Sequence, residues 1–242
     1  VGAIASFRYA RRVAILPVGV LAQAVGVASF PTLSNLYVNE KFKDLRDLIR
    51  RQISILYILN LAIVLLFFTN SEGIVSLVYE RGAFDNSDVV RVSSIMSIVS
   101  FAILPWSINQ IVTRSFYIQS KYWYPVLIGT AATILSTILI FNTQNQSETN
   151  YAILIIIPLF AYSLVLLSTL RIDNQKILNN NLVKDLIVST FIGVFTFLLL
   201  LFIPIEGISN IGKLFVYTII IGVTFIVSVN VIKMKYIDIR SK

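Results

Sequence analysis

Seven long apolar stretches alternate with shorter polar segments along this chain. They cover residues 13–38, 53–69, 89–118, 125–141, 151–170, 186–203 and 214–232, and a helical lead-in from about Ile4 precedes the first. Each stretch approaches the roughly 20 apolar residues that an α-helix needs to cross about 30 Å of hydrocarbon. None alternates polar and apolar positions as the strands of a membrane barrel do. The pattern predicts an all-α polytopic membrane bundle of about seven transmembrane helices.

Five of the connecting segments are polar or carry helix-breaking residues, and they cover 39–51, 71–88, 142–150, 171–185 and 205–212. The first of them is charged and amphipathic. In the second, Asp85 or Ser87 is placed to cap the helix that follows. The segments are too short for a soluble domain, so we expect the chain to consist of the helices, their connections and a tail at 233–242.

Composition agrees with a membrane protein. Of 242 residues, 57% are hydrophobic and 13% are charged, whereas soluble domains average about 45–50% and about 25%. These values exclude an ordinary soluble enzyme, a disordered chain and a disulfide-stapled secreted module. The chain contains no Cys and no His, which removes thiolate nucleophiles, the commonest general base and the commonest metal ligand.

No enzyme signature is present either. The sequence contains no phosphate-binding loop of the GxxxxGK[ST] type and no paired acidic metal motif within an apolar stretch. We therefore expect neither a cofactor nor a metal. A transporter or a structural membrane subunit is favoured over an enzyme.

The net charge of +8 has two interpretations, nucleic-acid binding or the excess of Lys and Arg in cytoplasmic loops. The second is favoured, because most Lys and Arg residues gather in 39–51, around Lys121, in 171–185 and in the tail. With seven spans these four regions lie on one side. We expect that side and the C-terminus to be cytoplasmic, with 142–150 on the other side and no nucleic-acid partner.

Three arginines near the start of the chain break this charge pattern. Arg8, Arg11 and Arg12 precede the first apolar stretch at its non-cytoplasmic end. On a helix, spacings of three and four residues bring side chains to one face. Two interpretations stay open: the arginines snorkel to lipid headgroups, or they form a cationic cluster facing a water-filled cavity that holds an anion.

Polar and helix-breaking residues also occur within the apolar stretches. Pro17 and Gly19 predict a kink or break in the first helix. Gln23, at mid-depth, either joins two helices or lines a cavity, and the former is favoured. The serine-rich third stretch is predicted to lie inside the bundle, with Arg114 as an interface anchor, whereas the last three stretches are predicted to be peripheral and to face lipid.

Three ordered motifs resemble the MurJ/MviN lipid II flippase family. The first runs from Tyr9-Ala10-Arg11-Arg12-Val13 through Leu16-Pro17-Val18-Gly19-Val20 and Ala24 to Phe30-Pro31-Thr32-Leu33-Ser34. The second is Tyr79-Glu80-Arg81-Gly82-Ala83-Phe84, and the third is Arg114-Ser115-Phe116-Tyr117 followed by Pro125. The motifs cover about the first half of the chain, and the remainder matches in hydropathy.

The resemblance implies a fold of fourteen transmembrane helices in two lobes. This chain would supply the eighth to fourteenth helices, as a segment of a longer protein whose N-terminal lobe is its partner. Residues 1–170 would then hold the helices of the C-terminal lobe, with a cavity-lining first helix over 4–38. Residues 186–232 would hold the final two peripheral helices.

The resemblance also implies site residues. The motif arginine falls on Arg12, which in the family lies in the central cavity and helps to bind the headgroup of lipid II. Arg8 and Arg11 match the motif less well, because family members often carry a non-basic residue at the position of Arg11. The last two helices would flank a groove for the lipid tail, where Gly193 and Gly222 are the small positions.

The function we expect is a lipid II flippase that works by alternating access in a bacterial inner membrane. Its partners would be lipid II or a similar polyprenyl-diphosphate lipid and the membrane lipids. Two alternatives remain: a flippase of another polyprenyl-linked oligosaccharide, and a membrane scaffold that does not transport. A membrane glycosyltransferase is disfavoured by the lack of a catalytic acid cluster.

Overall fold

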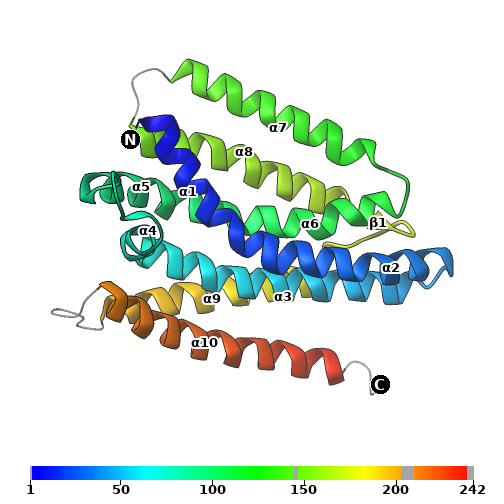
Figure 1. Ribbon diagram of the computed structural model, residues 1–242. Helices are drawn as coiled ribbons and strands as arrows, with labels where there is room; N and C mark the ends of the chain where they lie inside the picture. Colours follow the sequence, from blue (N-terminus) through cyan, green and yellow to red (C-terminus); the bar gives the residue numbers. More distant parts are fainter. Residues whose placement is uncertain (1, 144–146, 203–209, 239–242) are drawn as a thin grey trace.

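The computed structural model describes residues 2–143, 147–202 and 210–238 as a bundle of helices with one small hairpin (Figure 1). Side-chain surroundings in the last helix are described for residues 212–226. The elements in chain order are α1 Ala3–Pro17, η1 Val18–Gln23, α2 Ala24–Val38, α3 Phe42–Thr69, α4 Ser71–Tyr79, α5 Asn86–Val99, η2 Ser100–Ala102, α6 Ile103–Tyr117, α7 Trp123–Asn142, α8 Glu148–Thr169, β1 Arg171–Ile172, β2 Gln175–Lys176, α9 Asn180–Leu201 and α10 Asn210–Asp238.

Six helical spans within the described residues are long and apolar enough to cross a membrane. α1, η1 and α2 join into one span, Ile4–Val38, and α5, η2 and α6 join into another, Asn86–Tyr117. The seventh predicted stretch lies in α10, whose described apolar part, Gly212–Ile226, is shorter. The all-α membrane bundle is confirmed, with six spans of full length and one shorter apolar helix.

The bundle is built around α3 and the α5–α6 span. In the most apolar window, 61% of the residues of the α5–α6 span are buried, against 6% in α7. Fully buried Ile53, Met96, Ile103 and Ile111 come from these two spans. The prediction that the serine-rich third stretch lies inside the bundle is confirmed. The high exposure of α7, which packs on α8 (Figure 1), does not follow from its sequence.

The first span bends without breaking (Figure 1). Pro17 ends α1, and the next six residues form the π-helical turn η1 before α2 begins. A proline removes a backbone donor from the helical ladder, and π-turns are a usual accommodation of such a defect. The kink predicted from Pro17 and Gly19 therefore takes the form of a wider turn in a continuous helix.

Three of the connections rich in Lys and Arg meet at one end of the bundle. The α2–α3 turn, the α6–α7 turn and the β1–β2 hairpin lie at the same end (Figure 1). Residues from all three line a common pocket. α4 and the start of α5 lie at the other end of the bundle, beside the beginning of α1. The arrangement along the chain matches the alternation of sides expected from the charge pattern.

Several connections contain more structure than their sequence predicted. α3 begins at Phe42, so most of the charged segment 39–51 is helical rather than a loop. Residues 171–185 contain the β1–β2 hairpin, turned by Asp173 and Asn174 at φ of 51° and 57°. α10 continues to Asp238, into the range expected as a tail.

The predicted cap of the third stretch is confirmed for Asp85, whose side chain accepts a hydrogen bond of 3.0 Å from the backbone N–H of Asp88. Parts of three other predicted segments lie outside the described residues. These parts are residues 144–146 of the polar segment 142–150, residues 205–209 of the expected turn 205–212, and residues 239–242 of the tail.

Candidate functional site

The arginine-bearing helix α1 has one buried side and one open side. Ala10, Val13 and Ala14 are almost completely buried against the bundle. Arg8, Arg11 and Arg12 are all exposed, so the chain leaves these three cations on an open face of the first span. The geometry places positive charge where a ligand or a further protein surface can reach it.

The arginines diverge along this face. The guanidinium of Arg11 lies over the ring of Trp106 in α6, with Cζ 5.9 Å from the ring centroid. That distance is within the range of a cation–π contact. The positive charge of Arg12, the next residue, is close enough to act on Tyr79 at the end of α4. Arg11 is therefore held by an aromatic ring of the bundle, whereas the charge of Arg12 acts on the tyrosine that opens the second motif.

An aromatic cluster joins the first two sequence motifs. Tyr9 of α1, Tyr79 at the end of α4 and Phe84 of the following loop pack with ring centroids 4.9 to 5.7 Å apart. Tyr79 Oη also donates a hydrogen bond of 3.3 Å to the backbone carbonyl of Tyr9. Burial raises the pKa of Tyr79, and the charge of Arg12 offsets part of that rise.

The loop between the aromatic residues depends on one glycine. Gly82 adopts φ of 64°, a left-handed conformation that residues with a Cβ rarely adopt. The turn at this position returns Phe84 to Tyr9 and Tyr79. The motif from Tyr79 to Phe84 thus fixes the connection between α4 and α5 against the helix that carries Arg12.

The third motif contacts the first motif where Arg114 packs against Gly26. The guanidinium of Arg114 packs against Gly26 of α2, where an added Cβ would lie 2.8 Å from Arg114 Cζ. Nη1 of Arg114 donates to the backbone carbonyl and to Oε1 of Gln110, both at 2.8 Å. A side chain at this position of the first span would displace the guanidinium from its present place.

Arg114 also lines a pocket of about 640 Å³ between the first span, α6 and α8. Trp106, Gln110, Tyr162 and Pro31 contribute to the same wall. The sequence predicted Arg114 as an interface anchor. The structure shows that it also lines a pocket beside the kinked helix, and the run of polar residues in the third stretch was the signal for that pocket.

Gln23 stands on the π-helical turn and is exposed. Within the described part of the chain, no hydrogen bond joins its side chain to another helix. It does not connect two helices there, which was the interpretation favoured from the sequence. Its exposed amide lies on the same kinked span as the arginines.

The two glycines predicted for the tail groove have different surroundings. Gly193 of α9 is buried against α3, where an added Cβ would lie 2.9 Å from Leu61 Cδ2. Gly222 of α10 is half-buried, and among the described atoms nothing would lie within 4 Å of its added Cβ. Gly193 therefore permits close helix packing, whereas Gly222 borders open space.

Two pairs of polar groups also join α3 to α9, one of them buried and the other exposed. Ser54 Oγ donates to Oδ2 of the buried Asp185 at 3.4 Å, and the hydroxyls of Tyr57 and Thr190 are 2.9 Å apart. The sequence placed Asp185 at the end of a connecting segment, but it lies in the first turns of α9. No group of three or more His, Cys, Asp or Glu residues that could hold a metal occurs among the described residues.

Comparisons with known proteins agree on one family. The family model described as lipid II flippase MurJ matches residues 1–222. A probable lipid II flippase MurJ of Rhizobium tropici is 29% identical over 143 residues, which are 58% of this chain and 27% of the relative. The corresponding protein of Treponema pallidum is 24% identical over 139 residues, which are 57% of this chain and 26% of the relative.

A solved structure has the same fold. The lipid II flippase MurJ in an inward closed conformation matches 98% of this chain and 48% of its own length, with a TM-score of 0.77 and 18% identity. The chain spans about a quarter of the length of the curated relatives and about half of the solved chain. This coverage fits the expectation of one half of a two-lobe flippase.

Proposed function

Because the chain belongs to the lipid II flippase MurJ family, we propose that it forms one lobe of a flippase for the peptidoglycan precursor lipid II. The precursor would move from the cytoplasmic to the outer leaflet of a bacterial inner membrane, in which the chain is a multi-pass protein. The observation that carries the proposal is the exposed arginine face of α1, held beside the loop of the second motif. A transporter of this kind performs no chemistry on its substrate.

Alternating access is the mechanism that suits this arrangement. An N-terminal lobe would face the open side of α1, so that the headgroup crosses between the lobes while the polyprenyl tail stays in lipid. A diphosphate in a low-dielectric cavity requires nearby cations. The guanidinium is suited to this, because it offers bidentate hydrogen bonds to phosphate oxygens.

The side chains of the first span would share this work unequally. Arg12 is the principal contact to the diphosphate, since it is exposed, its charge acts on Tyr79 of the second motif, and it matches the motif arginine. Arg8 adds charge on the same face, Arg11 is partly engaged by Trp106, and Gln23 offers an amide to the headgroup sugars. Arg114 adds a further cation from the pocket beside Gly26.

The last two helices would hold the lipid tail. α9 exposes Phe191 and Phe195, its C-cap Phe202 is also exposed, and α10 exposes Phe215 and Ile219. These apolar surfaces suit a polyprenyl chain, with Gly222 at an open position on α10 and Gly193 at the contact of α9 with α3. The end of the bundle that holds the basic connections is proposed to be cytoplasmic, together with the C-terminus.

The test is complementation in cells depleted of their own flippase. Arg12→Ala should abolish growth at normal expression, and Arg12→Lys should restore it only in part, because an ammonium lacks the bidentate geometry. Arg8→Ala and Arg11→Ala should be milder. Lys43→Ala, which removes an exposed cation from the other end of the bundle, serves as the matched control and should grow normally.

Full growth of Arg12→Ala would contradict the cavity role. A headgroup anchor predicts that Ala is tolerated and that Lys substitutes completely, and a scaffold predicts that none of the arginines matters. A flippase for another polyprenyl-linked oligosaccharide would fail to complement even as the wild type. Lipid II at the outer leaflet is therefore also measured directly, at a confirmed level of the protein. Absence of flipped lipid II at normal expression would favour the alternative substrate.

A further inference from the structure

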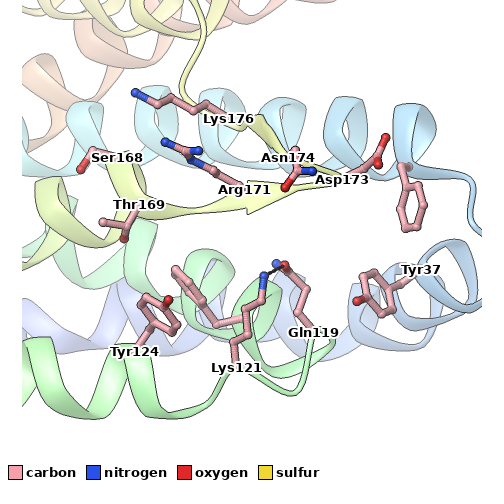
Figure 2. A pocket seen from close by; sticks show the side chains of 12 residues that line it. Tyr37, Gln119, Lys121, Tyr124, Ser168, Thr169, Arg171, Asp173, Asn174 and Lys176 are labelled. Atoms are coloured by element: carbon pink, nitrogen blue, oxygen red, sulfur yellow. Dashed lines mark hydrogen bonds between the residues drawn. The ribbon is translucent and has the colours of Figure 1, made fainter.

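A second basic site lies at the opposite end of the spans from Arg12. The three connections at that end enclose a pocket of about 590 Å³ (Figure 2). Its walls come from the end of α2 with the start of α3, the end of α6 with the start of α7, and the hairpin that follows α8. Its size falls within the roughly 300–1,000 Å³ typical of small-molecule sites.

The charged residues that line this pocket are mostly cationic. Lys121, Arg171 and Lys176 are exposed, and within the described part of the chain none of them forms an ion pair with a carboxylate. Asp173 supplies the single carboxylate of the lining, and its Oδ2 lies 3.8 Å from Nη1 of Arg46. The ammonium of Lys121 donates to Gln119 at 3.0 Å (Figure 2). The pocket therefore carries net positive charge that an anion can neutralise.

The hairpin wall is fixed by two other arginines. Arg46 donates to the backbone carbonyl of Ile172 at 3.2 Å. Arg50 donates to the carbonyls of Ile177 and Lys176 at 3.0 and 2.9 Å. Ile172 and Ile177 are also fully buried, so the hairpin is fixed to α3 by hydrogen bonds and anchored by two apolar side chains.

Aromatic residues place the pocket at the membrane surface. Tyr124 lines it and stacks on Phe116 with ring centroids 5.5 Å apart, and Tyr37 lies on the other side (Figure 2). The preceding Tyr122 and Trp123 are 53% and 62% exposed at the start of α7. Exposed Tyr and Trp at the ends of spans mark the level of the lipid headgroups. A basic pocket between helices at this depth suits an anionic headgroup.

We propose that this pocket binds the phosphate of an anionic phospholipid from the surrounding leaflet. Lys121, Arg171 and Lys176 neutralise the phosphate, and Phe42, Phe116 and Tyr124 contact the glycerol and the first carbons of the chains. The bound lipid then bridges the α6–α7 turn and the hairpin, two connections that belong to different parts of the bundle. The site is separate from the arginine face of α1 and does not depend on the substrate that the protein carries.

The experiment is lipid titration of the purified protein, followed by native mass spectrometry. The probe is dioctanoyl phosphatidylglycerol, and dioctanoylglycerol is the control lipid without a phosphate. The variant combines Lys121→Gln, Arg171→Gln and Lys176→Gln. The matched control combines Lys41→Gln, Lys43→Gln and Arg51→Gln, which remove the same charge from exposed positions at the same end. Equal thermal stability of both triple variants is established first.

We expect the wild type and the control to retain phosphatidylglycerol with affinities within twofold of each other, and the pocket variant to lose at least fivefold. Dioctanoylglycerol should not bind selectively to any of the three. Equal losses in the two triple variants would overturn the proposal in favour of general charge attraction. Competition by inorganic phosphate at equal concentration would assign the pocket to a soluble anion, and tenfold tighter binding of farnesyl diphosphate would assign it to a diphosphate lipid. Both results would overturn the proposal.

Discussion

At the scale of single residues, the contact between Gly26 and Arg114 shows how the first span and α6 depend on each other. A methyl group at Gly26 would lie 2.8 Å from Arg114 Cζ and would force the guanidinium away from Gln110. We predict that Gly26→Ala reduces complementation by displacing Arg114. Growth at limiting expression measures the effect.

Gly129→Ala is the matched control for this prediction, because its new Cβ would meet Tyr162 at an ordinary distance of 3.6 Å. It should grow as the wild type does. The double variant Gly26→Ala, Arg114→Ala should be no worse than Arg114→Ala alone, since the displaced group is absent. A defect in Gly26→Ala that adds fully to that of Arg114→Ala would show that the glycine acts by another route.

The two glycines near the end of the chain are predicted to respond differently to a large side chain. Gly193→Trp should destabilise the protein, because the indole would overlap Leu61 where α9 meets α3; overpacking of this kind typically costs about 1–3 kcal/mol. Gly222→Trp should leave the folded protein stable, since its Cβ points to open space, but should reduce flipping if a lipid tail passes there. Thermal unfolding in detergent and a flipping assay separate the two effects.

The companion variant Gly193→Ala, Leu61→Ala tests the packing explanation. It should be at least as stable as Leu61→Ala alone, because the smaller residue makes room for the new methyl group. Unchanged flipping in Gly222→Trp would remove that position from the proposed tail groove.

Residue-scale roles were partly accessible from the sequence. The open placement of Arg8, Arg11 and Arg12 follows from spacing together with the apolar residues between them. The partners do not follow, because Trp106, Tyr79 and Gly26 come from segments far from their contacts along the chain. Arg114 was assigned to the membrane interface from its position alone, whereas its packing against Gly26 depends on how α2 crosses α6.

At the scale of elements, α4 and the loop after it pack against α1. The ring of Tyr79 packs on Tyr9 and Phe84, and such aromatic pairs contribute about 0.5–1.5 kcal/mol beyond burial. We predict that Tyr79→Ala loosens the loop. Trypsin added to the non-cytoplasmic side of the membrane should then cleave after Arg81 several-fold faster. Flipping should fall as well, since the loop lies beside Arg12.

Tyr79→Phe provides the control for the loop. It keeps both ring contacts and loses only the 3.3 Å hydrogen bond to the carbonyl of Tyr9. Cleavage close to the wild-type rate is therefore expected. If Tyr79→Ala is cleaved no faster than Tyr79→Phe, the aromatic cluster does not hold the loop.

Element positions were easier to predict than element boundaries. Within the described residues, each of the seven apolar stretches is almost entirely helical, because a membrane span must satisfy its backbone hydrogen bonds internally. The start of α3 was missed because its first turns are polar and lie beyond the apolar stretch, where hydropathy carries no signal. The exposure of α7 was missed because α7 and α8 have similar composition, and which of the two packs on α6 is a tertiary property.

At the scale of the whole molecule, the distribution of charge and the path of the chain agree. The connections with the most Lys and Arg meet at one end of the bundle, although they come from three separate places along the chain. Two arginines at the same end, Arg46 and Arg50 of α3, also hold the hairpin in place by hydrogen bonds to its backbone. The Lys and Arg residues that are expected to set the membrane orientation thus also contribute to packing. Substituting Arg46 or Arg50 would therefore affect both orientation and packing.

The orientation itself is tested by residues that serve neither role. The chain has no cysteine, so single cysteines can be introduced at Lys43, next to the α2–α3 turn, and at Thr143, after α7. The positive-inside rule predicts that an impermeant maleimide added outside labels Thr143→Cys and not Lys43→Cys. The pattern should reverse in inverted vesicles, and Arg12, at the same end as Thr143, would then face the outer side when the cavity opens outward. Labelling of Thr143→Cys from the cytoplasmic side alone would show that the bundle has the opposite orientation. The arginine face would then lie at the wrong end to release a headgroup outside.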